Sequence, residues 1–287
     1  MGEGQPTISR RALLKGATGL AVLWPVLPAL AGAAHPVVPV AEAAPGLAGL
    51  IGERLEFRVG FWIFSQAGYV KTALLPLAGT ANRFEATMIG QTAGVIGFFT
   101  RYRKDTYRSV MELAGGRLRP LEFSEEVIVG KEVRRRRTTS FDYARQVMVR
   151  QKRQGAKVES EEFPMAPGTV YDDYLSGLYN FRAGLYGPLR QGSTFVLNVP
   201  RNKGGRIRLE LCGPEETRRL LSRERATEAK AYYCRVFMDK DALKSGNGRL
   251  GGWFSAAGVP MGGVMEDVAL FGDITGTLVS RQVASRV

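Results

Sequence analysis

The sequence predicts a mainly β domain, built as an antiparallel sandwich or an incomplete barrel with one or two short helices. Long stretches alternate apolar and polar residues, turn signals separate these stretches, and there is neither a heptad run nor a repeat of fixed period. At 287 residues and 45% hydrophobic residues, the chain can bury a sizeable core. We therefore expect one large domain after any leader.

The N-terminus has the features of an export signal. The segment Ser9–Lys15 resembles the twin-arginine signal, with Leu13 where that pattern usually has Phe, and an uncharged Gly- and Ala-rich run over 16–34 follows it. Arg10 and Arg11 are the predicted recognition residues. The resemblance implies contact with the twin-arginine export machinery and a periplasmic destination.

A transmembrane helix is the alternative for this run. The run is barely long enough to span a bilayer and contains Pro25 and Pro28, so we favour a leader. A small-residue cleavage pattern ending at Ala43 predicts a signal peptide over 1–43 and a single β-rich periplasmic domain over 44–287; a second pattern ends at Ala33. The leader carries little net charge, so the basicity belongs to the mature domain.

The first half of the mature chain is typical of an antiparallel meander. From Glu53 to about Phe64 apolar side chains alternate with polar ones, which predicts a half-buried strand. Further strands are predicted over 69–77, 83–89, 107–113, 121–129 and 143–149. The segment 154–168 has the composition of a polar connection.

Four consecutive arginines follow the strand that ends near Val129: Arg134, Arg135, Arg136 and Arg137. Alternate residues of a strand point to opposite faces, so both faces are charged and this strand must leave the core. Because the chain carries a net charge of +13, the cluster is a candidate patch for an anionic surface. A merely solvated basic surface is the alternative.

The second half combines one helix with further strands. An acidic pair and a stripe containing Leu175, Leu178 and Tyr179 predict a helix over 172–181. Strands are predicted over 193–199, 206–211, 229–238, 251–256 and 265–279, the last long enough to contain a turn.

Three segments resemble the exported bacterial family catalogued as domain of unknown function 3108. They are the opening strand and turn over 52–68, the helical segment over 173–182, and the tail over 253–278. The resemblance implies a periplasmic β domain and carries over no catalytic residue.

Within the helical segment, Asp173, Ser176, Tyr179 and Arg182 form a candidate cluster, the last three recurring every three residues. They could face a ligand. We favour the interpretation that they anchor the helix to the sheet through hydrogen bonds and an ion pair.

The residue inventory excludes several kinds of catalytic site. The only histidine, His35, precedes the preferred cleavage point, so histidine triads and ordinary zinc sites are not expected in the mature domain. Two cysteines cannot build a four-cysteine metal site, and we expect neither a metal nor a cofactor. The segment 246–251 fits Gly-x-Gly-x-x-Gly but precedes no helix, so we interpret it as a turn.

Cys212 and Cys234 fall on or beside strands that could pair. An oxidising compartment would allow a disulfide bridge between them. Two separate buried thiols are the alternative.

Three function hypotheses remain. The first is a noncatalytic binding or carrier domain for an apolar or anionic envelope-derived ligand, such as a lipid or glycan. The second is a structural or assembly partner of envelope proteins, and the third is a carboxylate-dependent enzyme acting on an envelope polysaccharide. Nucleic-acid binding suits the charge but not the export address.

Overall fold

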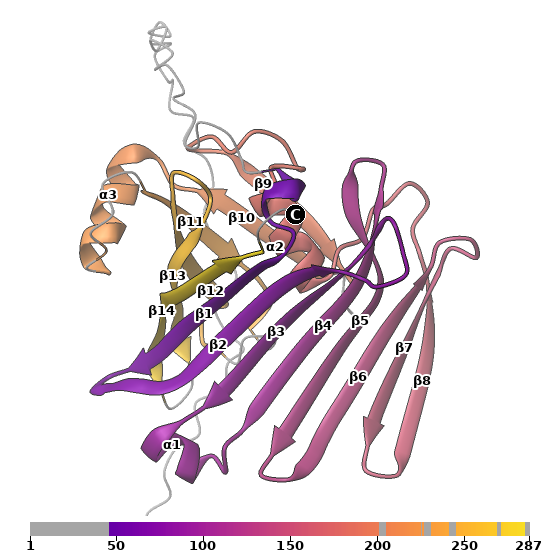
Figure 1. Ribbon diagram of the computed structural model, residues 1–287, viewed down its shortest axis with the longest axis horizontal. Coiled ribbons are helices and arrows are strands. Elements are labelled where there is room, and N and C mark those ends of the chain that lie inside the picture. Colours follow the sequence, from indigo (N-terminus) through magenta and orange to yellow (C-terminus); the bar gives the residue numbers. More distant parts are fainter. Residues whose placement is uncertain are drawn as a thin grey trace, which may run out of the picture. The chain divides into compact units, whose positions relative to one another are not determined.

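The computed structural model describes residues 46–200, 205–224, 226, 231–240, 245–268 and 271–284. The predicted leader, with Arg10, Arg11 and His35, lies outside these residues. The described part of the chain forms one antiparallel sheet of fourteen strands (Figure 1).

Eight strands precede the central helix: β1 (Glu53–Phe61), β2 (Phe64–Pro76), β3 (Arg83–Thr92), β4 (Lys104–Ala114), β5 (Arg117–Val129), β6 (Glu132–Asp142), β7 (Val147–Gln154) and β8 (Lys157–Pro164). Six follow it: β9 (Thr194–Val199), β10 (Gly205–Leu211), β11 (Ala231–Phe237), β12 (Arg249–Ser255), β13 (Pro260–Val268) and β14 (Gly272–Val283). The α-helices described are α1 (Gly94–Phe99), α2 (Tyr174–Arg182) and α3 (Pro214–Arg223), and a 3-10 turn, η1, covers Leu47–Gly49.

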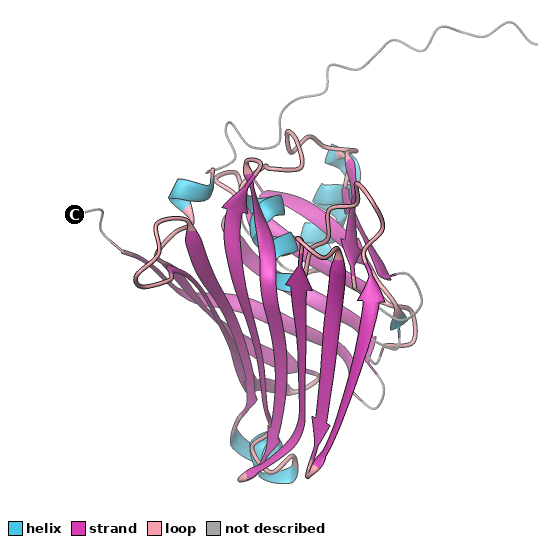
Figure 2. Cartoon of the chain, turned by 90° about the vertical axis from the view of Figure 1, so that its right-hand side faces the viewer, coloured by secondary structure: helices cyan, strands magenta, loops and turns pink. Residues whose placement is uncertain are grey.

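The strand order is that of a ring opened at one place. It runs β8-β7-β6-β5-β4-β3-β2-β1-β14-β13-β12-β11-β10-β9, so every strand pairs with its neighbours in the sequence except at two points. β1 pairs with β14, and β8 and β9, which are consecutive along the chain, are the two free edges. The segment between these edges contains α2, which lies at one end of the long strands (Figures 1 and 2). The predicted incomplete barrel is confirmed, and the sandwich alternative is not adopted.

Several predicted elements differ from the structure. The segment 154–168 is not only a polar connection, because Lys157–Pro164 forms β8 and pairs with β7 along its whole length. β8 is an edge strand rich in charge, so it lacks the apolar alternation that marks the other strands. The predicted last strand, 265–279, is divided between β13 and β14, and α1 and α3 were not predicted.

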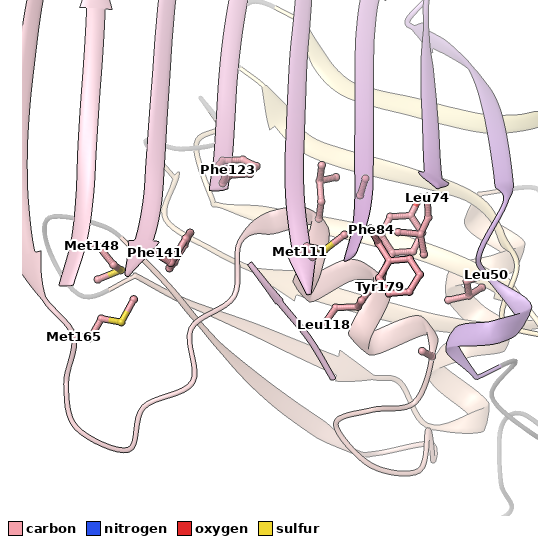
Figure 3. Close-up of a cluster of buried hydrophobic side chains, with 13 residues drawn as sticks. Leu50, Leu74, Phe84, Met111, Leu118, Phe123, Phe141, Met148, Met165 and Tyr179 are labelled. Atoms are coloured by element: carbon pink, nitrogen blue, oxygen red, sulfur yellow. The ribbon is translucent and has the colours of Figure 1, made fainter. Parts of the chain in front are cut away.

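The largest core cluster lies between α2 and the inward face of β2–β7 (Figure 3). Register places apolar residues of neighbouring strands side by side, with Leu74 opposite Ala86 and Phe84 opposite Met111. Tyr179 of α2 packs onto this row and is 1% exposed. α2 thus supplies the side chains that cover the inward face at this end.

Two further clusters occupy the two faces of the second half of the sheet. On one face, Phe181 of α2 packs with residues of β9–β12, including Tyr232 and Cys234. The other cluster lies under α3 and comprises Cys212, Leu220, Leu221, Tyr233 and Trp253. The helix α2 therefore contributes to the cores of both halves of the sheet.

Candidate functional site

The N-terminus of α2 is fixed by a reciprocal cap. The Asp173 carboxylate accepts hydrogen bonds from the backbone N–H groups of Leu175 and Ser176, and Ser176 Oγ accepts one from the Asp173 N–H. Ser109 Oγ of β4 donates to the same carboxylate at 2.5 Å. Burial raises the pKa of Asp173 to about 6, against the stabilising effect of these donors. Asp173 thus joins the start of α2 to β4.

The preceding residue, Asp172, attaches the helix to β5. Its carboxylate lies 2.8 Å from Arg117 Nη2 and accepts from Asn180 Nδ2 at 3.1 Å. Asn180 also exchanges two 2.8 Å hydrogen bonds with the backbone N–H and C=O of Leu118. Burial raises the pKa of Asp172 despite the opposing effect of Arg117. These contacts satisfy the polar groups of β5 where the helix covers it.

The C-terminal turn of α2 is anchored by a buried ion pair. Arg182 Nη1 lies 2.7 Å from Glu53 Oε2, and Arg182 Nε donates to the C=O of Gly258 at 3.4 Å. The Arg182 guanidinium also lies 5.6 Å from the centre of the Tyr179 ring. Desolvation raises the pKa of the Tyr179 hydroxyl to about 12. All four residues of the candidate cluster are buried, each with an exposed fraction of 1% or less.

A cavity of about 580 Å³ lies between the two free ends of the sheet. Its walls come from β5–β8 on one side and from β9, β10 and the two residues after β11 on the other, and the start of α2 also borders it. The apolar lining consists of Phe123, Phe141, Tyr174, Val199, Ile207 and Met238; the charged lining includes Glu125, Arg137, Arg150, Lys152, Glu159, Glu161, Arg206 and Asp239. Arg150 Nη2 donates to the C=O of Pro200 at 3.1 Å, which joins β7 to the residue that follows β9.

Strand register orders the charges of this cavity into a row. Glu125 of β5 is opposite Arg137, Arg137 is opposite Lys152, and Lys152 is opposite Glu159. Arg137 Nη1 lies 3.8 Å from Glu125 Oε2, and Lys152 Nζ lies 3.6 Å from Glu159 Oε2. Two cations therefore stand side by side between two carboxylates, on the face that also carries Phe123 and Phe141.

Comparison with known proteins assigns the chain to a family. Residues 57–278 match the family described as Protein of unknown function (DUF3108). The chain belongs to this DUF3108 family. No curated protein matches. The DUF3108 match covers the predicted helical segment 173–182 and the tail 253–278 in full.

One solved structure has a similar fold over most of the DUF3108 chain. The beta-barrel-like protein of domain of unknown function DUF1849 from Brucella abortus, a crystal structure, aligns over 82% of this chain and 99% of its own. The two are 10% identical, with a TM-score of 0.46. Similarity at this level carries no argument about function.

The four predicted patch arginines of this DUF3108 chain do not form one surface. Arg137 lines the cavity, whereas Arg136, on the opposite face of β6, contacts Glu126. Arg134 lies 2.7 Å from Glu132. The sequence analysis therefore found a residue of the cavity, Arg137, but placed it in one patch with Arg134 and Arg136 of the opposite face. It missed Glu159 and Glu161 because β8 was interpreted as a connection.

Cys212 and Cys234 are free, buried thiols in the structure, so the expected bridge is not formed. Cys234 is in register with Leu211, which places the next residue, Cys212, on the opposite face of the sheet. The two thiols accordingly belong to different core clusters. Burial raises the pKa of Cys212 to about 11 and that of Cys234 further.

The described part of the DUF3108 chain contains no group of three or more His, Cys, Asp or Glu side chains arranged to hold a metal ion. Nor does any described helix have the length and apolar character needed to cross a bilayer. The Gly-x-Gly-x-x-Gly segment forms a turn after Ser245 and leads into β12. No described helix follows it, so it lacks the context of a dinucleotide-binding site.

Proposed function

We propose that the mature chain is a noncatalytic periplasmic binding or carrier domain for an amphiphilic, envelope-derived ligand that carries an anionic group. The observation that carries this proposal is the 580 Å³ cavity, in which apolar side chains share one face with a row of charges that includes two adjacent cations. Its volume lies within the usual range for small-molecule sites. Periplasmic location is supported by the twin-arginine-like segment that contains Arg10 and Arg11.

The apolar lining suits the hydrocarbon or ring portion of such a ligand. Phe123 and Phe141 are mostly buried, and Ile207 of β10 lines the same cavity from its other wall. Removing apolar surface from water contributes about 25 cal/mol per Å². The apolar walls therefore favour binding without requiring a specific polar contact.

The cationic pair suits the anionic group. Arg137 and Lys152 already face the carboxylates of Glu125 and Glu159, so a ligand anion would compete with these partners. Arginine offers a planar fork of donors that matches carboxylate and phosphate oxygens. We expect exchange of partners, because the lysine and both carboxylates of this row are at least partly exposed to solvent.

The most deeply buried carboxyl group at the cavity, that of Asp173, has a structural role. Asp173 borders the cavity, but its carboxylate already accepts three hydrogen bonds, from Ser109 and from the N–H groups of Leu175 and Ser176. General acid or base catalysis needs a carboxyl group that can reach the reacting atom. Asp173 is therefore better suited to structure than to catalysis.

Native mass spectrometry with solvent extraction, on protein purified from the periplasm without detergent, tests this function. We expect a reproducible extra mass on the parent protein and its loss in Arg137→Gln/Lys152→Gln. The matched control is Arg136→Gln/Arg153→Gln, a register pair on the same two strands but on the opposite face. It removes the same charge and should retain the ligand.

An unliganded parent, or a cavity variant that keeps the extra mass, would contradict the proposal. An unliganded parent would favour the assembly-partner hypothesis, and crosslinking to protein partners would be the next experiment. Replacing Arg10 and Arg11 with Lys tests the predicted export signal separately. Continued export of the folded protein would contradict use of the twin-arginine route.

A further inference from the structure

An exposed apolar surface lies at the end of the long strands away from α2. Six of its side chains are more than half exposed, and we call them the aromatic tip: Trp62 (75%), Ile63 (88%), Val95 (60%), Phe98 (69%), Phe99 (75%) and Tyr102 (54%). They come from the β1–β2 turn and from the connection between β3 and β4, which contains α1 (Figure 1). Exposed apolar residues gathered in this way mark an interaction site.

Backbone contacts attach the α1 part of the tip to the sheet. The N–H of Ala93, before α1, donates to the C=O of Ala67 at 2.8 Å, which attaches α1 to β2. Gly97 is buried beneath Tyr102, and a Cβ at this position would lie 2.8 Å from the Tyr102 ring. Only glycine allows this close approach. Phe98 and Phe99, on the same helix, nevertheless point to solvent.

The tip also contains unusual backbone conformations. Trp62, Arg101 and Tyr102 have φ angles of 49°, 56° and 51°, a left-handed region that bulky residues rarely adopt. The conformation after α1 is held by two hydrogen bonds, from Tyr102 N–H to Gly97 C=O at 2.6 Å and from Gly130 N–H to Arg101 C=O at 2.7 Å. Strain of this kind concentrates at functional sites.

The charges beside the tip are mainly positive on the side of α1. The Arg101 guanidinium lies over Gly130 of the β5–β6 turn, whose next residue is the exposed Lys131. Arg103 is paired with Asp105 at 3.0 Å. On the other side, Gly272 lies beside Trp62, and Asp273 follows it. Arg101 and Lys131 thus place cations next to the exposed aromatic rings.

We propose that the aromatic tip docks the protein onto the surface of an anionic lipid bilayer. Trp, Tyr and Phe side chains partition into the interfacial region of a bilayer, and adjacent Arg and Lys side chains bind anionic headgroups. The tip is built from turns and a short helix, and none of its six side chains lines the 580 Å³ cavity. The net charge of +13 acts in the same direction. This surface is separate from the proposed ligand cavity and does not depend on it.

Flotation with lipid vesicles tests the docking. The protein as purified is mixed with vesicles of phosphatidylcholine alone or of phosphatidylcholine with phosphatidylglycerol. We expect flotation with the anionic vesicles and a reduction in affinity of at least about tenfold in Phe98→Asn/Phe99→Asn, because two rings no longer enter the interface. The control Val196→Asn/Val279→Asn replaces two valines that are 54% and 52% exposed outside the tip, and should bind like the parent.

The charge contribution is tested with Arg101→Asn/Lys131→Ser, since asparagine tolerates the left-handed backbone at 101. We expect this variant to lose about fivefold in affinity per charge for the anionic vesicles and to change little with phosphatidylcholine alone. The parent and all variants are prepared with the same N-terminus, so any contribution of the segment before residue 46 cancels in the comparison.

Equal binding of the parent and Phe98→Asn/Phe99→Asn would overturn the proposal. So would a parent that binds no vesicles. If that parent instead forms a concentration-dependent dimer that the tip variant abolishes, the surface is a contact between copies of the chain.

Discussion

Arg182 and Glu53 form an ion pair with 2.7 Å between Nη1 and Oε2, and their side chains are 1% and 0% exposed. The other oxygen of Glu53 accepts from Arg281 Nε at 3.0 Å. The carboxylate of Glu53, the first residue of β1, thus contacts both the last residue of α2 and a residue of β14. This is the point at which strands from the two ends of the described chain meet.

We expect Arg182→Ala to lower the free energy of unfolding by about 3–5 kcal/mol, because it leaves the carboxylate of Glu53 buried with one partner fewer. Urea denaturation followed by circular dichroism measures the change. Arg145→Ala is the control, since Arg145 pairs with Glu162 where both side chains are half-exposed, and we expect it to change stability by less than about 1 kcal/mol. A loss no larger than that of the control would show that the buried pair contributes little.

The carboxyl group of Asp173 should make stability depend on pH. Its pKa rises from 3.8 to about 6 on folding, so between these values the folded state binds more protons than the unfolded state. Stability from this group is therefore highest below about pH 4, falls as pH rises to about 6, and is then constant; the difference is roughly 3 kcal/mol at most.

Asp173→Asn keeps a side-chain cap on α2 and removes the titration. Subtracting the unfolding free energy of this variant from that of the parent at each pH isolates the contribution of the Asp173 carboxyl group to stability. A difference that does not change between pH 4 and pH 6 would contradict the raised pKa.

Both cysteines should be recovered as free thiols. Because they point to opposite faces of the sheet, we expect two alkylations per chain in urea without any reductant, measured by intact mass. In the folded protein, burial keeps Cys212 protonated near pH 8, so alkylation should be slow. A requirement for reductant before alkylation would reveal a bridge.

Two glycines should respond differently to alanine. A Cβ on Gly262 would overlap the ring of Trp253, which is 6% exposed, and would lie 2.7 Å from the C=O of Gly276. We expect Gly262→Ala to cost about 1–3 kcal/mol, measured by thermal or urea unfolding. Gly276→Ala meets no atom within 4 Å and should be within about 0.5 kcal/mol of the parent. Equal effects of the two would argue against close packing of Trp253 on β13.

Most strands could be predicted because one face of each is buried. The alternation from Leu55 onward and the acidic start of α2 reflect local constraints that a short window of sequence contains. β8 could not be found in this way, because its strand pairing is not accompanied by burial of an apolar face. For α3 a signal was present: Pro214 opens the helix and is followed by Glu215 and Glu216.

The site was less predictable than the fold. Its walls combine β5–β8 with β9 and β10, so the cavity depends on how two distant parts of the sheet approach each other. The sequence likewise could not predict that both side chains of the Arg182–Glu53 ion pair are buried, because charged residues are usually exposed. The helix residues Asp173 and Ser176 were found, since a capping box is a local pattern.

The pairing of β1 with β14 has a consequence for synthesis on the ribosome. Every other ladder in the sheet joins strands that are consecutive along the chain, so each hairpin has both of its strands as soon as the second one emerges. β1 is among the first strands made, yet its second edge is filled only by the last, and Glu53 and Arg281 are 228 residues apart. Until β14 is released, nascent chains carry an additional bare strand edge, which is a site for unwanted association. Chains that terminate before Gly272 lack β14 and keep that edge unpaired, so they should aggregate. Synthesis of the last strand therefore separates complete molecules from aggregation-prone ones.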